Sequence, residues 1–143
     1  MEKKIKFLFH FSAISVLPFW GLMILFPNYS LTKSVISSPW IIVPPSICYI
    51  ALLIPNLSKE VLLSFKNASP QKLAKIMARP WAASLFWTYA GAFDLFIGRW
   101  IYLDAQTLEI NHFLIAPILL VSIFFGPVGF LLYAALQLFI SAI

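Results

Sequence analysis

The sequence predicts an all-α integral membrane protein, a bundle of four transmembrane helices. Of the 143 residues, 62% are hydrophobic and only 10% are charged, and the mean hydropathy is +0.93. A soluble domain of ordinary composition carries about 25% charged residues. Four long apolar segments and an uneven distribution of basic residues support the same fold. The length suits one transmembrane domain over residues 1–143.

Three of the four apolar segments reach the roughly 20 residues that a transmembrane helix needs. They are residues 7–26, 81–103 and 113–140. The N-terminal residues lead directly into the first of them, and no small-residue cleavage site follows. We therefore expect this segment to remain as the first span and not to be removed as a signal peptide.

The second predicted span, residues 36–54, is weaker. Ser38 and Pro39 form a good N-cap and first-turn pair. A helix that begins there is short for a span, and Pro44 and Pro45 predict a kink.

Basic residues fix the predicted topology. Lys33 is the one basic residue in the loops on one side, whereas eight lie before the first span or between the second and third: Lys3, Lys4, Lys6, Lys59, Lys66, Lys72, Lys75 and Arg79. The positive-inside rule then places both termini on the basic, cytoplasmic or stromal side.

The loop between the second and third spans predicts a short helix. Ser69 and Pro70 provide a cap for residues 70–77, in which Leu73 and Ile76 share one face. Lys72, Lys75 and Arg79 lie away from this face, so we expect an interfacial helix on anionic headgroups. The alternative is a solvated loop that only sets the topology.

Asp94 is an ionisable residue in the middle of the third span. There an ionised aspartate costs roughly 2.5–3.5 kcal/mol, so the residue is a candidate functional group, whether charged or protonated. Ala90, Asp94, Gly98 and Tyr102 recur at four-residue steps, and Gly91 lies nearby. This small-residue stripe admits a helix or a flat ligand. The alternative is plain helix packing, with Asp94 bonded to a neighbouring helix.

Arg99 lies five residues from both Asp94 and Asp104. Partners within one helix need three or four steps, so we expect Arg99 to bind another helix, a ligand, or a lipid phosphate reached by snorkelling. Asp104 lies near Glu109 and His112, and a hydrated loop end explains its charge equally well.

Proline residues mark the same depth in two other spans. Pro18 lies in the first span, and Gly126 and Pro127 lie in the fourth, where proline frees a backbone carbonyl. We expect Asp94 to face the interior and to contact one of these positions, in a ligand site between kinked helices. The alternative is that these prolines only shape packing.

The third span is also rich in aromatic residues, including Trp87 and Tyr89. These rings suit an apolar ligand or ordinary lipid contact.

Catalytic and cofactor motifs are absent from the sequence. There is no nucleophile elbow, phosphate-binding loop, zinc-protease motif or dinucleotide fingerprint. With two histidines and Cys48 as the single cysteine, we expect no metal site, no cofactor and no internal disulfide. The net charge of +5 is confined to particular loops, so we expect no nucleic-acid partner.

Several of these residues together resemble the neoxanthin-synthase-like family, also called abscisic-acid-deficient-4-like. The matching residues are Asp94-Leu-Phe96, Arg99, Tyr102, Asp104, His112, Gly126-Pro-Val-Gly129 and the first block Leu17-Pro-Phe-Trp20. Plant members are chloroplast membrane proteins required to make neoxanthin from violaxanthin. The chain resembles the cyanobacterial or bacterial members, since we expect no transit peptide before the first span. Tyr89 departs from the family pattern, in which a histidine occupies this position.

The resemblance implies a carotenoid isomerase that uses no redox cofactor. Asp94 would be the acid, and Arg99, Asp104 and Tyr89 would assist. The implied substrate-binding residues are Gly91, Gly98, Tyr102, Trp87, Gly126 and Pro127. A carotenoid would then lie against the third span with its polar end near Arg99 and Asp104, in a thylakoid or plasma membrane.

Two other functions remain open. The first is a non-catalytic carotenoid- or lipid-binding protein that serves as a subunit or assembly factor of a photosynthetic complex, or as a homo-oligomer. The second is a small transporter, which one acid and one arginine support poorly.

Overall fold

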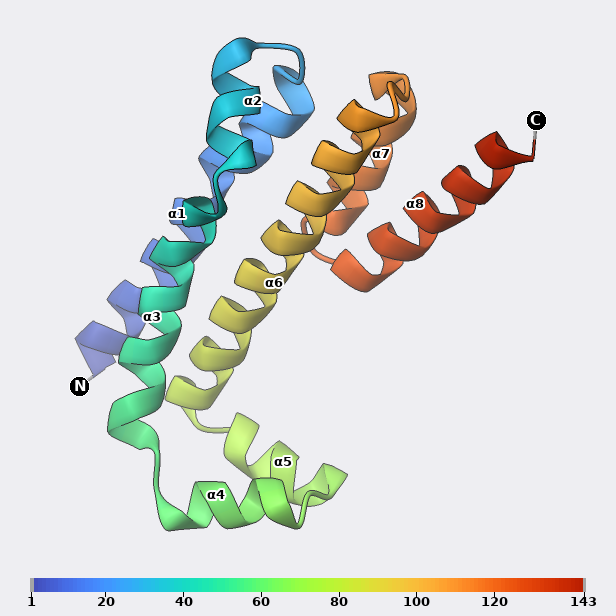
Figure 1. Cartoon of the computed structure of the whole chain (residues 1–143). Coiled ribbons are helices and arrows are strands. Elements are labelled where there is room, and N and C mark those ends of the chain that lie inside the picture. The colour runs from blue at the N-terminus through green and yellow to red at the C-terminus, as the bar shows by residue number, and fades with distance from the viewer. Residues whose placement is uncertain (1, 143) are drawn as a thin grey trace.

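The computed structural model describes residues 2–142, which form α-helices, two short 3-10 helices and no strand (Figure 1). The helical class predicted from the sequence is therefore confirmed. In chain order the elements are α1 (Glu2–Leu25), α2 (Ser30–Ser37), η1 (Pro39–Ile42), α3 (Val43–Leu53), η2 (Ile54–Asn56), α4 (Lys59–Lys66), α5 (Pro70–Met77), α6 (Pro80–Thr107), α7 (His112–Ser122) and α8 (Gly126–Ser141).

Helix α6 is the centre of the molecule. It packs against α1, α3, α7 and α8 and also contacts α2 and α5. Its residues Leu95, Ile101 and Tyr102 are buried in the main hydrophobic core, together with Trp20 and Met23 of α1. Because α6 has neighbours on several sides, its polar residues Ser84, Thr88 and Asp94 are buried.

The second apolar segment begins later than predicted. Residues 30–37 form the separate helix α2, and the continuous helical stretch starts at Pro39, where the Ser38 side chain accepts a hydrogen bond from the Trp40 N–H at 3.4 Å. Pro44 and Pro45 lie in the first turn of α3. A missing N–H is harmless in that turn, so the expected kink inside a helix is replaced by a new helix start.

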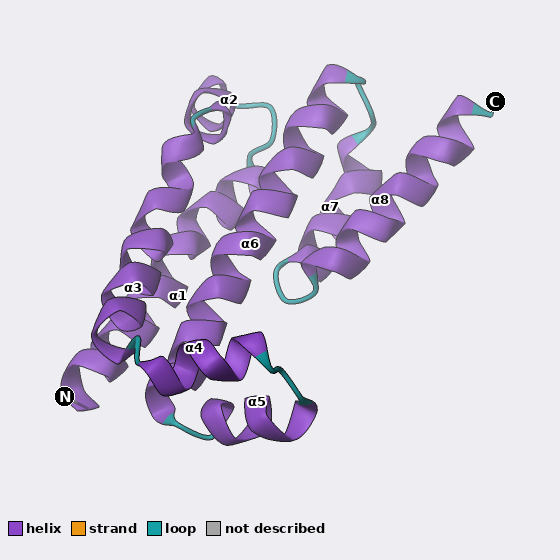
Figure 2. Ribbon diagram, turned by 60° about the horizontal axis from the view of Figure 1, so that its bottom comes forward, coloured by secondary structure: helices purple, strands orange, loops and turns teal. Residues whose placement is uncertain are grey.

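Two helices, not one, occupy the loop before α6. Helix α5 has the predicted bounds, and the Ser69 side chain caps it by accepting the Lys72 N–H at 3.3 Å. Helix α4 was not predicted, although Ser58 caps it in the same way through the Val61 N–H at 3.3 Å. Both helices run across the end of the long helices in both views (Figures 1 and 2).

The prediction of one continuous fourth span is wrong. Residues 113–140 are divided between α7 and α8, which meet at the turn after Ser122 and form a V (Figure 1). Pro127 lies in the first turn of α8, where proline is favoured. A Cβ on Gly129 would lie 1.8 Å from the Ser122 Oγ. Only glycine therefore allows the two helices to approach so closely.

The reversal at this turn moves the C-terminus. The last residues of α8 lie at the end of the molecule that holds α2, whereas α1 starts at the end with α4 and α5 (Figure 1). This arrangement differs from the expectation that both termini share one side. A single spanning helix would have carried the chain back, but α7 has only 11 residues and α8 only 16.

Within the described residues, two helical segments are long and apolar enough to cross a membrane. They are Glu2–Leu25 and Pro39–Asn56, and this is weak support for a membrane protein. Helix α6 is long enough, but Asp94, Arg99 and its tryptophan and tyrosine residues lower its hydropathy. Four spans are therefore not established.

Candidate functional site

Asp94 connects α6 to the start of α8. Its side chain is only 7% exposed, and its Oδ1 accepts a hydrogen bond from the Gly126 N–H at 3.0 Å. Gly126 is the first residue of α8. The N-terminal N–H groups of a helix lack partners within the helix and favour negative charge. The predicted interior position of Asp94 beside Gly126 is confirmed.

Arg99 connects α6 to the end of α2. Its Nε donates to the Ile36 carbonyl at 2.8 Å, and its Nη2 donates to the Ser37 carbonyl at 2.6 Å. These carbonyls belong to the last turn of α2, where helix carbonyls lack partners and favour positive charge. The prediction that Arg99 binds outside its own helix is confirmed, with backbone carbonyls as the partners.

Asp104 connects α6 to the second half of α8. Its Oδ2 accepts hydrogen bonds from the Tyr133 hydroxyl at 2.7 Å and from the Gln137 Nε2 at 2.5 Å. Tyr133 is fully buried. Asp104 is therefore more than the hydrated loop end of the alternative interpretation. Tyr133 and Gln137 are not among the predicted site residues, although their four-residue spacing places them on one face of a helix.

Two further residues of the pattern hold the end of α1. The Tyr102 hydroxyl donates to the Pro27 carbonyl at 2.6 Å. The His112 Nε2 lies 2.9 Å from the Ile24 carbonyl oxygen. Both carbonyls lie at or just after the C-terminal end of α1. The polar residues around α6 thus bind the ends of three other helices.

The four predicted catalytic residues are not brought together at one centre. Asp94, Arg99 and Asp104 bind three different partners, and among the described residues none of them bonds to another. Tyr89 is 50% exposed, and its ring lies against Phe93 with the ring centroids 5.8 Å apart. Tyr89 also points to no hydrogen-bond partner in the described part of the chain.

The predicted flat face at Gly98 is already occupied. A Cβ on Gly98 would lie 2.3 Å from the Trp20 Cη2, so the indole of α1 fills the place expected for a ligand. Gly126 is equally enclosed, since its Cβ would lie 2.3 Å from the Asp94 Oδ1. Gly91 is different, because beyond the adjacent backbone of α6 no heavy atom lies within 4 Å of its hypothetical Cβ.

A small cavity of about 130 Å³ lies beside Gly91 and Asp94. It is bounded by α1, α6 and the turn between α7 and α8, and Trp20, Trp87 and Phe124 contribute to its wall. Of the predicted site residues, Asp94, Gly91 and Trp87 therefore share one cavity. The carboxyl group of Asp94 is the acidic group in its lining.

A larger apolar groove of about 710 Å³ lies between α6 and α8. Its lining consists of Phe93, Phe96, Ile97, Trp100, Pro127, Phe130 and Leu131. The rings of Trp100 and Phe130 are in contact within this lining, with the ring centroids 5.5 Å apart. Pro127 is the one predicted binding residue in this groove, which otherwise depends on the position of α8.

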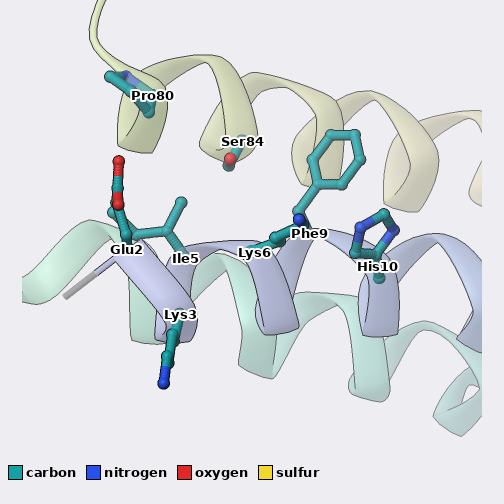
Figure 3. Close-up of a pocket in the computed structure, with 8 residues that line it drawn as sticks. All are labelled: Glu2, Lys3, Ile5, Lys6, Phe9, His10, Pro80 and Ser84. Carbon is teal, nitrogen blue, oxygen red and sulfur yellow. The ribbon is translucent and has the colours of Figure 1, made fainter.

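A third cleft, of about 600 Å³, separates the first turns of α1 and α6 (Figure 3). Glu2 points toward Pro80, whereas Lys3 points away from α6 (Figure 3). Lys6, His10 and Ser84 also line the cleft. It contains none of the predicted site residues.

Comparison with known families decides the relationship of this chain. A family model described as ABA DEFICIENT 4-like matches residues 7–133. The chain belongs to this family. The resemblance drawn from the sequence pattern is thereby confirmed. Comparisons with curated proteins and with solved structures give no match.

In this ABA DEFICIENT 4-like protein, the residues that carry the family resemblance are also interhelical contacts. The matched region contains Asp94, Arg99, Tyr102 and Asp104 with their partners up to Tyr133. Each side chain satisfies backbone groups at a helix end or joins two helices. The pattern therefore specifies how the helices assemble around α6, whatever chemistry it also supports.

Proposed function

We propose that this ABA DEFICIENT 4-like chain is a membrane protein of carotenoid metabolism that isomerises an epoxy-carotenoid of the violaxanthin type to an allenic product. The observation that carries this proposal is the apolar groove between α6 and α8, about 710 Å³ in volume, whose lining residue Ile97 lies one helical turn from the buried Asp94. Apolar pockets with few polar groups are typical small-molecule sites. Family membership supplies the class of substrate.

The groove and the small cavity are both lined by residues near the junction of α6 with the start of α8, and they share no lining residue. Ile97 lines the groove, and its Cδ1 lies 3.0 Å from the hypothetical Cβ of Gly126. The backbone N–H of Gly126 donates a hydrogen bond to the Asp94 Oδ1. A rod-shaped polyene in the groove would bring its ring toward this junction. The carboxyl group of Asp94 would then be the nearest acid.

The proposed reaction needs only proton transfers. A protonated Asp94 would donate its proton to the epoxide oxygen as one of the two C–O bonds breaks. A base would remove a proton from the chain carbon next to the opened ring carbon, and the electron pair would complete the allene. One proton is gained and one is lost, so substrate and product are isomers.

Expression in a bacterium that accumulates violaxanthin tests this proposal. We expect an allenic isomer of the same mass in the pigment extract, separated by chromatography, and none with Asp94→Asn at equal protein level. Unchanged violaxanthin with the wild-type chain in the membrane fraction would contradict the isomerase proposal.

A non-catalytic role as a carotenoid- or lipid-binding subunit or assembly factor is the second candidate. It is favoured by the commitment of Asp94, Arg99 and Asp104 to helix contacts and by the exposed Tyr89. Purification in mild detergent separates the two functions. Bound carotenoid without any new isomer supports binding alone.

A further inference from the structure

Helices α4 and α5 form a small platform, residues 59–77, at one end of the molecule. The two helices contact each other, and α5 also contacts α6. Buried Val61 and Ile76 anchor their inner sides. An ion pair of 3.0 Å between the Glu60 Oε1 and the Arg79 Nη2 fastens α4 to the start of α6. The platform is thus held in a defined place.

The outer surface of the platform is both apolar and basic. Leu62 and Phe65 are 53% and 59% exposed, and Leu63 is exposed as well. Lys59, Lys66, Lys72 and Lys75 are also exposed. Glu60 is the one acid of the platform, and Arg79 neutralises it. The four lysines therefore have no carboxylate of the platform left to neutralise them, although the Lys72 Nζ donates to the Asn67 carbonyl at 3.3 Å.

We infer that this platform binds the anionic headgroups of a lipid surface. Leu62 and Phe65 enter the boundary of the acyl chains, and Lys66, Lys72 and Lys75 contact the negatively charged groups. A basic amphipathic helix that lies in the membrane plane has this combination of side chains. The inference rests on the proposed membrane location of the chain.

The orientation of the platform favours a lipid surface over another partner. Helices α4 and α5 run across the ends of α3 and α6 in both views, as a surface layer does relative to spanning helices (Figures 1 and 2). Helix α1 begins at the same end, and its first turns add Lys3 and Lys6 there (Figures 1 and 3). Nucleic acid would use the lysines but would leave Leu62 and Phe65 exposed.

Hydrogen exchange of the full chain in lipid nanodiscs tests the inference. Discs of phosphatidylcholine alone are compared with discs that also contain phosphatidylglycerol. We expect amides of residues 59–77 to exchange more slowly in the anionic discs. Each lysine near an anionic surface contributes about fivefold in binding. Lys66→Glu/Lys72→Glu/Lys75→Glu should therefore abolish the difference between the two discs.

Lys33→Glu is the control, because it reverses a charge at the opposite end of the molecule, and it should keep the difference. Circular dichroism and unchanged exchange in α6 will show that the triple variant is folded. Equal exchange in both discs, or protection that appears only with a protein partner, would overturn the inference. The amount of carotenoid bound by the protein in the same discs tests the proposed function separately, since the triple platform variant should bind as much carotenoid as the wild type.

Discussion

Arg99 shows how one side chain can join two helices. Its guanidinium donates to two successive carbonyls, those of Ile36 and Ser37, at the end of α2. The planar group reaches both acceptors from fixed positions, whereas a lysine ammonium is a single point charge. A hydrogen bond to a charged group contributes roughly 1.5–3 kcal/mol to the stability of the folded protein.

We therefore expect Arg99→Lys to lower the free energy of unfolding by about 1–2 kcal/mol and Arg99→Gln to lower it further. Thermal unfolding in detergent, followed by circular dichroism, measures both. If both variants unfold at the same temperature as the wild type, the contact to α2 contributes nothing to stability.

The role of Asp94 can be divided into an acceptor and an acid. Asp94→Asn keeps an oxygen for the Gly126 N–H, so we expect it to fold with nearly wild-type stability and to lose any proton-transfer activity. Asp94→Ala removes the acceptor and should cost about 1–3 kcal/mol, because a buried N–H then loses its partner. The free energy of unfolding and the pigment extract are compared for both variants. Full activity in Asp94→Asn would exclude Asp94 as the acid.

At the scale of helices, glycine residues of α6 have opposite roles. Gly98 lies under the Trp20 ring of α1, and Gly91 faces open space beside the small cavity. Gly98 is therefore a packing position and Gly91 an open position, although the sequence pattern treats both as parts of one small-residue face.

Gly98→Ala should destabilise the protein by about 1–3 kcal/mol, because the new methyl group overlaps Trp20. Gly91→Ala is the matched control and should raise the free energy of unfolding by up to about 1 kcal/mol through helix propensity. Chemical unfolding in mixed micelles measures the pair. The same effect from both substitutions would contradict the packing of α1 on α6.

For the whole molecule, the V formed by α7 and α8 decides where the chain ends. We expect cysteines at Ser34 and Ser141 to be labelled from one side of the membrane and a cysteine at Ala68 from the other. The three positions are exposed, and native Cys48 is buried and serves as the unreactive background. Impermeant maleimides in intact and opened vesicles give the readout. Labelling of Ser141 together with Ala68 would instead restore the continuous fourth span.

The sequence by itself determined the helical class, the family pattern, the start of α5 and the need of Arg99 for a partner beyond its own helix. These features depend on local signals: apolar run length, a serine–proline cap and the angular spacing of charges. Pro127 was read as a kink, but it starts a helix, since local sequence does not tell whether a chain continues or reverses.

Only the tertiary structure decided what each small or polar residue faces. The stripe at Gly98 is filled because Trp20, far away in the sequence, packs on it. The apolar groove exists because α8 turns back beside α6, which brings Phe130 opposite Trp100. Contacts between distant segments depend on the packing of all helices at once, and the period of a single helix carries no information about them.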